Sequence, residues 1–221
     1  MIDTAQLYSN AQKMIGRSLI NKKKIVTKIM PLKKIPKNKK LEYFKKNLEK
    51  CLKDLKYQKI YGLMMHDEKD IFQDDFFYKY VDELKKSRII KKFGYSTYEI
   101  KNAIENKKIY NFNILQAPLN IFDLNTEKIK FMRLIKKNYE LHIRSIFLQG
   151  VILNNKKLNF KEINQRIFEL DKIIKKRKFN GRYQFILSVL KDLKIADYCI
   201  IGCLNKSEIN DIDNFKYKKT K

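Results

Sequence analysis

Short apolar runs alternate with longer amphipathic stretches along almost the whole chain, and this order constrains the fold more than any other feature. The apolar runs have the length and residue types of strands, and they cover residues 1–4, 24–30, 59–66, 90–96, 112–117, 141–147 and 197–202. The stretches between them repeat apolar residues at helical spacing, as in the stripe of Leu41, Phe44, Leu48, Leu52 and Leu55. Strand and helix thus alternate at intervals of roughly 30 residues. This predicts an α/β fold with a parallel sheet, because parallel neighbours need a crossover helix.

Several of these runs are apolar almost throughout, including residues 60–66 and 198–202, as expected of strands that are covered on both faces. Such strands suit either a closed barrel or an open doubly wound sheet. No run is followed by the G-x-G-x-x-G or G-x-x-x-x-G-K-S/T loop that marks open nucleotide-binding sheets. We therefore predict one domain over residues 1–213, an incomplete (β/α)8 barrel with seven parallel strands. Residues 214–221 are expected to form a polar, lysine-rich tail.

The formal net charge of +26 raises the question of nucleic-acid binding. Only seven of the 50 basic residues are arginine, whose planar guanidinium reads bases and phosphates through paired hydrogen bonds. The lysines are dispersed along the chain, with their densest runs at 22–24 and 33–40. We expect solvated lysine faces and no specific nucleic-acid partner, although these runs can bind polyanions nonspecifically. A basic nucleic-acid-binding protein is the alternative from a different function class.

No apolar run approaches the ~20 residues that span a bilayer, and the first residues do not resemble a signal peptide. The sequence therefore predicts a cytoplasmic protein without a membrane partner. The cysteines Cys51, Cys199 and Cys203 form no C-x-x-C pair, and no histidine lies near them at metal-ligand spacing. No metal site is expected, and the oligomeric state is left open.

Polar residues at the ends of apolar strands are the candidates for chemistry, because the loops of a parallel barrel converge at the C-terminal ends of its strands. Asp3 ends the first predicted strand, and Tyr8 follows it in the next loop. Lys28 lies among apolar neighbours in the second strand, and His66 ends the third. Each residue alone has an ordinary interpretation: a helix cap, a partly exposed lysine or a structural histidine.

Together these four residues form a complete set for the reduction of a carbonyl group. Hydride delivery to the carbonyl carbon leaves charge on the oxygen, which needs a proton and hydrogen-bond donors. Tyr8 can donate that proton if a nearby cation stabilises its phenolate. Lys28 can be the cation, Asp3 can hold Lys28 charged, and His66 can direct a ring N–H at the carbonyl oxygen.

At these residues the sequence resembles the aldo/keto reductase family, and the similarity runs from Ile2 to about Ile212. The segment IDTAQLYSN is similar to the family segment with the catalytic aspartate and tyrosine, VTKI to the strand with the lysine, and LMMHD to the strand with the histidine. The resemblance implies a TIM-type barrel that acts as an NAD(P)-dependent oxidoreductase. It would reduce a small aldehyde or ketone by hydride transfer, with Tyr8 as the proton donor and Asp3, Lys28 and His66 as the other catalytic residues.

The resemblance extends to the segments FGYST, QAPLN and RSIFLQG, and it implies where NADP or NAD would bind. Ser96 and Gln116 would hydrogen-bond the nicotinamide carboxamide. Arg144 would occupy the position of the aromatic residue that stacks on the nicotinamide, a role that a guanidinium plane can take. Ser145, the next residue, is also assigned to the cofactor site.

Three departures from the family pattern stand out. Thr97 replaces an asparagine that contributes a carboxamide contact. Glu208 falls where an arginine usually binds the 2′-phosphate of NADP, so we expect weak discrimination between NADP and NAD, or a bias to NAD. Family members also have one strand and one helix before the segment with which this chain starts. We expect either a natural start upstream of Met1 or a truncated, non-catalytic relative.

Overall fold

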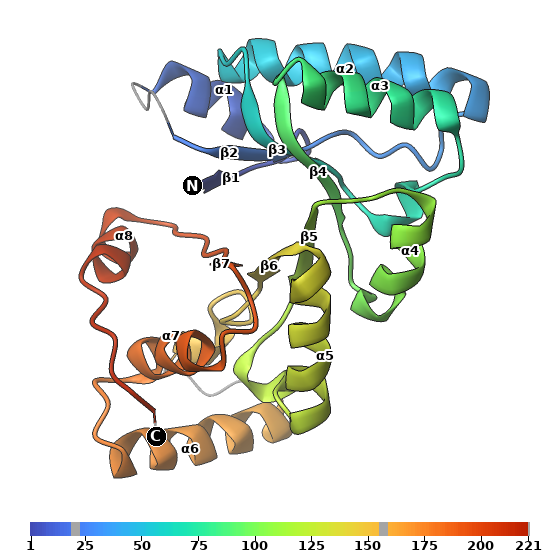
Figure 1. The fold of residues 1–221 in the computed structure, drawn as a ribbon. Helices are drawn as coiled ribbons and strands as arrows, with labels where there is room; N and C mark the ends of the chain where they lie inside the picture. Colours follow the sequence, from blue (N-terminus) through green and yellow to red (C-terminus); the bar gives the residue numbers. More distant parts are fainter. Residues whose placement is uncertain (19–22, 155–158, 221) are drawn as a thin grey trace. The chain divides into compact units, whose positions relative to one another are not determined.

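The structure is a computed structural model that describes residues 1–18, 23–154 and 159–220 (Figure 1). Its strands are β1 (Ile2–Asp3), β2 (Ile25–Lys28), β3 (Ile60–Met65), β4 (Ile90–Ser96), β5 (Ile114–Pro118), β6 (Glu140–Arg144) and β7 (Tyr198–Cys199). The strands are parallel, and their order in the sheet is their order along the chain. Each overlaps a predicted apolar run. The predicted incomplete (β/α)8 barrel with seven parallel strands is confirmed for the described part of the chain.

At least one helix follows every strand. The helices are α1 (Ala11–Arg17), α2 (Lys40–Leu55), α3 (Asp75–Lys86), α4 (Ala103–Ile109), α5 (Thr126–Asn138), α6 (Lys161–Lys176), α7 (Arg182–Leu193) and α8 (Lys206–Asp213). Helix α2 buries Phe44, Leu48, Cys51 and Leu55 along one stripe, with Cys51 in the buried position that the sequence pattern assigned to Leu52. Within the described residues, no helix combines the length and the apolar character needed to span a bilayer.

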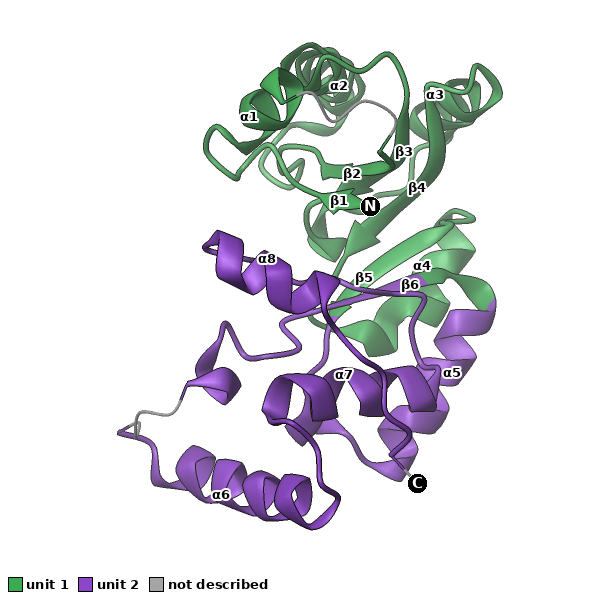
Figure 2. Cartoon of the chain, turned by 90° about the vertical axis from the view of Figure 1, so that its left-hand side faces the viewer, with its two compact units in different colours: residues 1–117, 138–140 green, residues 118–137, 141–221 purple. Residues whose placement is uncertain are grey.

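The chain divides into two compact units (Figure 2). Unit 1 comprises residues 1–117 and 138–140, and unit 2 comprises residues 118–137 and 141–221. Unit 1 contains β1 to β4, most of β5 and the helices α1 to α4. Unit 2 contains β7, most of β6 and α5, and the helices α6 to α8. The expected single domain over residues 1–213 stays a prediction.

In unit 1, α2 and α3 cover one face of the sheet (Figure 1). The ring of Phe93 in β4 lies 6.1 Å from that of Phe44 in α2, centroid to centroid. Because successive strand residues point to opposite faces, the residues next to Phe93 point away from these helices. On that opposite side, which we call the inner face, Val26 of β2, Met64 of β3 and Ile114 of β5 pack together.

Strands β4 and β5 approach each other closely at Gly94, which is in register with Ile114. A Cβ atom at Gly94 would lie 1.7 Å from the carbonyl oxygen of Ile114 and 2.6 Å from its Cγ2 atom. These distances are far shorter than any non-bonded contact, and one of the atoms belongs to the backbone. Only glycine therefore fits at this position without moving a strand.

We expect Gly94→Ala to lower the free energy of unfolding by about 3 kcal/mol or more, because the added methyl group forces β4 away from β5. Denaturant unfolding followed by circular dichroism measures this change. Gly202→Ala is the matched control, since no atom of the described residues lies within 4 Å of a Cβ atom at Gly202. The control should change stability by less than about 0.5 kcal/mol. Similar stabilities for the two variants would contradict the close approach of β4 and β5 at Gly94.

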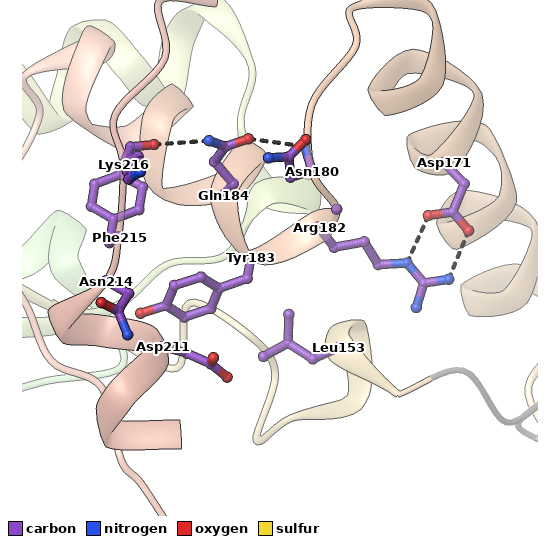
Figure 3. A pocket seen from close by; sticks show the side chains of 11 residues that line it. Leu153, Asp171, Asn180, Arg182, Tyr183, Gln184, Asp211, Asn214, Phe215 and Lys216 are labelled. Atoms are coloured by element: carbon purple, nitrogen blue, oxygen red, sulfur yellow. Dashed lines mark hydrogen bonds and ion pairs between the residues drawn. The ribbon is translucent and has the colours of Figure 1, made fainter. Parts of the chain in front are cut away.

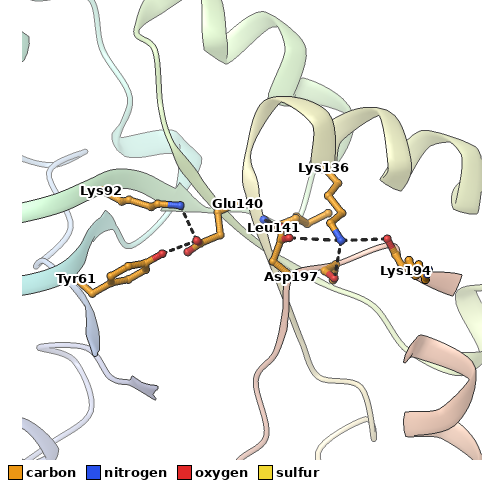
Figure 4. A network of polar contacts seen from close by, with 8 residues as sticks. Tyr61, Lys92, Lys136, Glu140, Leu141, Lys194 and Asp197 are labelled. Atoms are coloured by element: carbon orange, nitrogen blue, oxygen red, sulfur yellow. Dashed lines mark hydrogen bonds and ion pairs between the residues drawn. The ribbon is translucent and has the colours of Figure 1, made fainter. Parts of the chain in front are cut away.

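In unit 2, Asp197 fixes the loop before β7 to the start of β6 (Figure 4). Its carboxylate accepts a hydrogen bond of 2.8 Å from the backbone N–H of Leu141 and pairs with Lys136 Nζ at 3.4 Å. Lys136 Nζ also donates to the carbonyl oxygens of Lys194 and Ala196, at 3.2 and 3.1 Å. These bonds tie α5 and the end of α7 to the N-terminal edge of the strands.

The lysine-rich tail contacts α7 within the described residues. The backbone N–H of Lys218 donates to the Ser188 hydroxyl at 3.3 Å, and that of Thr220 donates to the Asp192 carboxylate at 2.7 Å. The described part of the tail is thus attached to α7, and its separation from the barrel domain stays a prediction.

Candidate active site

Asp3, Lys28 and His66 lie at the C-terminal ends of β1, β2 and β3, all in unit 1. The parallel register places Asp3 beside Val26, and Lys28 beside Met64. Lys28 follows Val26 by two residues, and His66 follows Met64 by two, so each polar residue shares a face with an apolar one. The three polar residues therefore lie just beyond the apolar layer of the inner face.

Lys28 and Asp3 form a buried ion pair. Lys28 Nζ donates to Asp3 Oδ2 at 2.7 Å and Oδ1 at 2.9 Å, and to the carbonyl oxygen of Thr4 at 3.2 Å. The side chain of Lys28 is 2% exposed and that of Asp3 is 8% exposed. Removal of one partner from such a buried pair costs on the order of 3–5 kcal/mol, because an uncompensated charge stays buried. The two side chains are therefore interdependent.

The loop between β1 and α1 places Tyr8 over this ion pair. Lys28 Nζ lies 5.4 Å from the centroid of the Tyr8 ring, and the His66 ring lies 6.4 Å from it in an edge-to-face arrangement. Gln6 anchors the loop: its backbone N–H donates to the carbonyl oxygen of Lys28 at 3.0 Å, and its side chain accepts from the N–H of Met30 at 2.8 Å. Tyr8 is 47% exposed, so it is accessible to a ligand. The four predicted catalytic residues thus lie together, while their catalytic roles stay predictions.

Two of the predicted cofactor residues lie beside this group. Ser96 at the end of β4 is in register with Gln116 of β5, and both are almost fully buried. Gln116 Nε2 donates to Asp3 Oδ1 at 2.9 Å. The hydroxyl of Thr97 donates to the Glu68 carboxylate at 2.7 Å and accepts from the backbone N–H two residues further on. Thr97 is therefore engaged within the protein, and it does not reproduce the amide group of the asparagine that it replaces.

The other predicted cofactor residues, Arg144 and Ser145, lie in unit 2 at the end of β6. Arg144 Nη1 lies 3.5 Å from the Ser145 hydroxyl, and Ser145 has a left-handed φ of 60°. Glu208 belongs to the first turn of α8. Its carboxylate accepts from the N–H of Leu204 at 2.8 Å and from Asn205 Nδ2 at 3.0 Å. This carboxylate thus satisfies donors at the start of its own helix, where negative charge is favourable.

Unit 2 also contains a pocket of about 670 Å³ between α7, α8 and the tail (Figure 3). In its wall, the guanidinium of Arg182 forms two hydrogen bonds of 2.7 Å with Asp171. Burial raises the pKa of the Tyr183 phenol to about 12, so this group is neutral at physiological pH. The pocket is lined by neither Arg144 nor Ser145. Within the described part of unit 2, the pocket is therefore distinct from the positions of Arg144 and Ser145.

Asp70 is a buried carboxylate that the sequence analysis does not identify. Its Oδ1 atom accepts from the backbone N–H groups of Leu32 and Lys33, at 2.7 and 2.8 Å. It thereby links the loop after His66 to the loop after Lys28. Burial raises the pKa of Asp70, although these backbone donors oppose the shift. The sequence signal is the D-E-K-D segment that directly follows His66. Nothing in this segment shows that its last residue, Asp70, is the buried one.

The pH dependence of stability tests the state of Asp70. Folding raises the pKa of Asp70 above its ordinary value of 3.8. Between these two pKa values the native state binds more protons than the unfolded state. We expect the free energy of unfolding of the wild type to fall relative to that of Asp70→Asn as the pH rises through this window. Denaturant unfolding at each pH from about 4 to 7 measures the difference. A constant or rising difference would argue against a raised pKa.

The chain is similar to known proteins in sequence and in fold. A model of the aldo/keto reductase family matches residues 1–199. Similar solved structures include an aldo-keto reductase of Bacillus halodurans in its holo form, with 16% identity, a TM-score of 0.73, and coverage of 98% of this chain and 77% of that chain. The glycerol dehydrogenase of Gluconobacter oxydans has 18% identity, a TM-score of 0.65, and coverage of 97% and 80%. No curated protein sequence matches the chain.

Proposed function

Because the chain belongs to the aldo/keto reductase family, a family of oxidoreductases, we propose that it reduces a small aldehyde or ketone with hydride from NADPH or NADH. The observation that carries the proposal is the ion pair of Lys28 and Asp3 beneath Tyr8, with His66 beside the phenol ring. We also propose a cytoplasmic location and no specific nucleic-acid partner.

The polar groups around the ion pair suit a nicotinamide carboxamide. Ser96 and Gln116 offer both donors and acceptors at the ends of β4 and β5, which is what an amide needs. Arg144, in unit 2, offers a planar guanidinium for the stacking role that the family resemblance implies. When it is bound, the reduced nicotinamide supplies the hydride, and Ser96 and Gln116 would hold its carboxamide.

Tyr8 donates a proton to the substrate oxygen in this proposal. As that oxygen gains negative charge, the phenol O–H passes its proton to it and becomes a phenolate. Lys28 stabilises the phenolate by its positive charge, and Asp3 keeps Lys28 charged and in place. His66 directs a ring N–H at the same oxygen, which favours the transition state over the uncharged carbonyl.

We expect Tyr8→Phe to lower kcat by about 100-fold or more, because the variant lacks the proton donor. The dissociation constant of the cofactor should change by less than about threefold, since the phenol makes no carboxamide contact in this proposal. Steady-state kinetics and fluorescence titration with cofactor measure both quantities. Tyr80→Phe on α3 is the matched control and should keep wild-type kinetics. Equal turnover by Tyr8→Phe and the wild type would remove Tyr8 from the mechanism.

Cofactor preference tests the assignment of Glu208. We expect the wild type to bind NADP and NAD with similar affinity or to favour NAD, because a carboxylate repels the 2′-phosphate. Glu208→Arg should tighten NADP binding by about tenfold or more and leave NAD binding almost unchanged. Glu208→Gln separates loss of the negative charge from gain of a positive one. Wild-type binding of NADP a hundredfold tighter than NAD, a difference of ~2.7 kcal/mol, would show that another basic residue binds the phosphate.

A further inference from the structure

We propose that Gln116 is a positioning residue for the ion pair of Asp3 and Lys28, beyond the carboxamide contact that family resemblance implies for it. The inference rests on the proposed function for its effect on catalysis. The contact between Gln116 and Asp3 can be tested without a cofactor.

The geometry that points to this role is the set of donors around the Asp3 carboxylate. Oδ1 accepts from Lys28 Nζ and from Gln116 Nε2, each at 2.9 Å, and Oδ2 accepts from Lys28 Nζ at 2.7 Å. Gln116 is 1% exposed, so water competes little for the hydrogen bond of its amide nitrogen. Hydrogen bonds from neutral and charged donors to one carboxylate orient it strongly when they are buried.

The strand pattern explains how residues 113 positions apart meet. Gln116 follows Ile114 by two residues and so points to the inner face. Asp3 is in register with Val26, which contacts Ile114 on that face. Asp3 and Gln116 therefore belong to β1 and β5 but lie above the same apolar layer, and their side chains bridge the inner face of unit 1.

This bond has a consequence for proton donation. Without the amide of Gln116, the Asp3 carboxylate loses its donor from β5 and keeps the hydrogen bonds from Lys28. Lys28 Nζ would then be fixed less firmly below the Tyr8 ring. Gln116 Nε2 has a second hydrogen, and its Oε1 atom is an acceptor, so the same amide can contact a carboxamide. One side chain would thus link cofactor binding to the orientation of the proton-donating group.

Gln116→Met tests the proposal, because methionine has a similar length and lacks the amide donor. We expect kcat to fall by about tenfold, equivalent to ~1.4 kcal/mol. The limb of the kcat profile that reports proton donation should move to higher pH, because the phenolate is less stabilised. The KM for cofactor should also rise, because the variant loses the amide that contacts the carboxamide, so the lower kcat at saturating cofactor and the shifted limb are the readouts of positioning. Ser96→Ala is the matched control: it removes the other predicted carboxamide contact, so it should raise the KM for cofactor and leave the pH profile unchanged.

A measurement on the cofactor-free protein separates this proposal from the proposed function. The 13Cγ NMR resonance of Asp3 should shift in Gln116→Met and stay in place in Ser96→Ala. Gln116→Asn, which is too short to reach Asp3, should reproduce the shift if the methionine variant does not fold. An unshifted resonance would overturn the proposal, as would a variant with a raised KM for cofactor and an unchanged kcat profile. If the resonance shifts between the wild type and Gln116→Met but the wild type has no reductase activity, the contact is supported and the proposed function is rejected.

Discussion

The buried ammonium of Lys28 sets conditions that much of unit 1 has to meet. A lysine that is 2% exposed needs an anion and hydrogen-bond acceptors at short range, because burial removes the water that would solvate its charge. Asp3 and the carbonyl oxygen of Thr4 meet this need from the end of β1. Asp3 in turn accepts from Gln116 of β5. The charge thus requires β1, β2 and β5 to be in place together.

Hydrogen bonds of polar side chains, of which Asp70 and Thr97 are buried, connect the loops around this pair. Gln6 binds the backbone of Lys28 and Met30, and Asp70 binds the backbone of the loop that follows. Thr97 and Glu68 connect the loops after β4 and β3. Hydrogen bonds are directional, so they fix loop backbones that have no regular secondary structure. Tyr8 can consequently be half exposed and still sit at a defined place over Lys28.

The residues predicted to contact the cofactor differ in whether their side chains already form hydrogen bonds within their own loop or helix. Ser96 and Gln116 lie beside the ion pair in unit 1. Thr97 uses its hydroxyl within the protein, and Glu208 uses its carboxylate to cap α8. These two positions carry the departures from the family pattern, and both have side chains occupied by local bonds. In unit 1, the proposed carboxamide contacts are therefore left to Ser96 and Gln116.

The sequence by itself determined the parallel α/β class, the positions of all seven described strands and the residues at the strand ends. Periodicity shows which side of its own element a residue takes, and apolar runs show which strands are covered, so these features are local. The tertiary structure decided that Cys51 and not Leu52 completes the buried stripe of α2. The spacing of apolar residues does not determine the exact rotation with which a helix packs on the sheet. The tertiary structure also decided that Asp70 binds Leu32 and that Gln116 binds Asp3. Those partners lie 38 and 113 positions apart, and only the folded sheet brings such distant residues within hydrogen-bond distance.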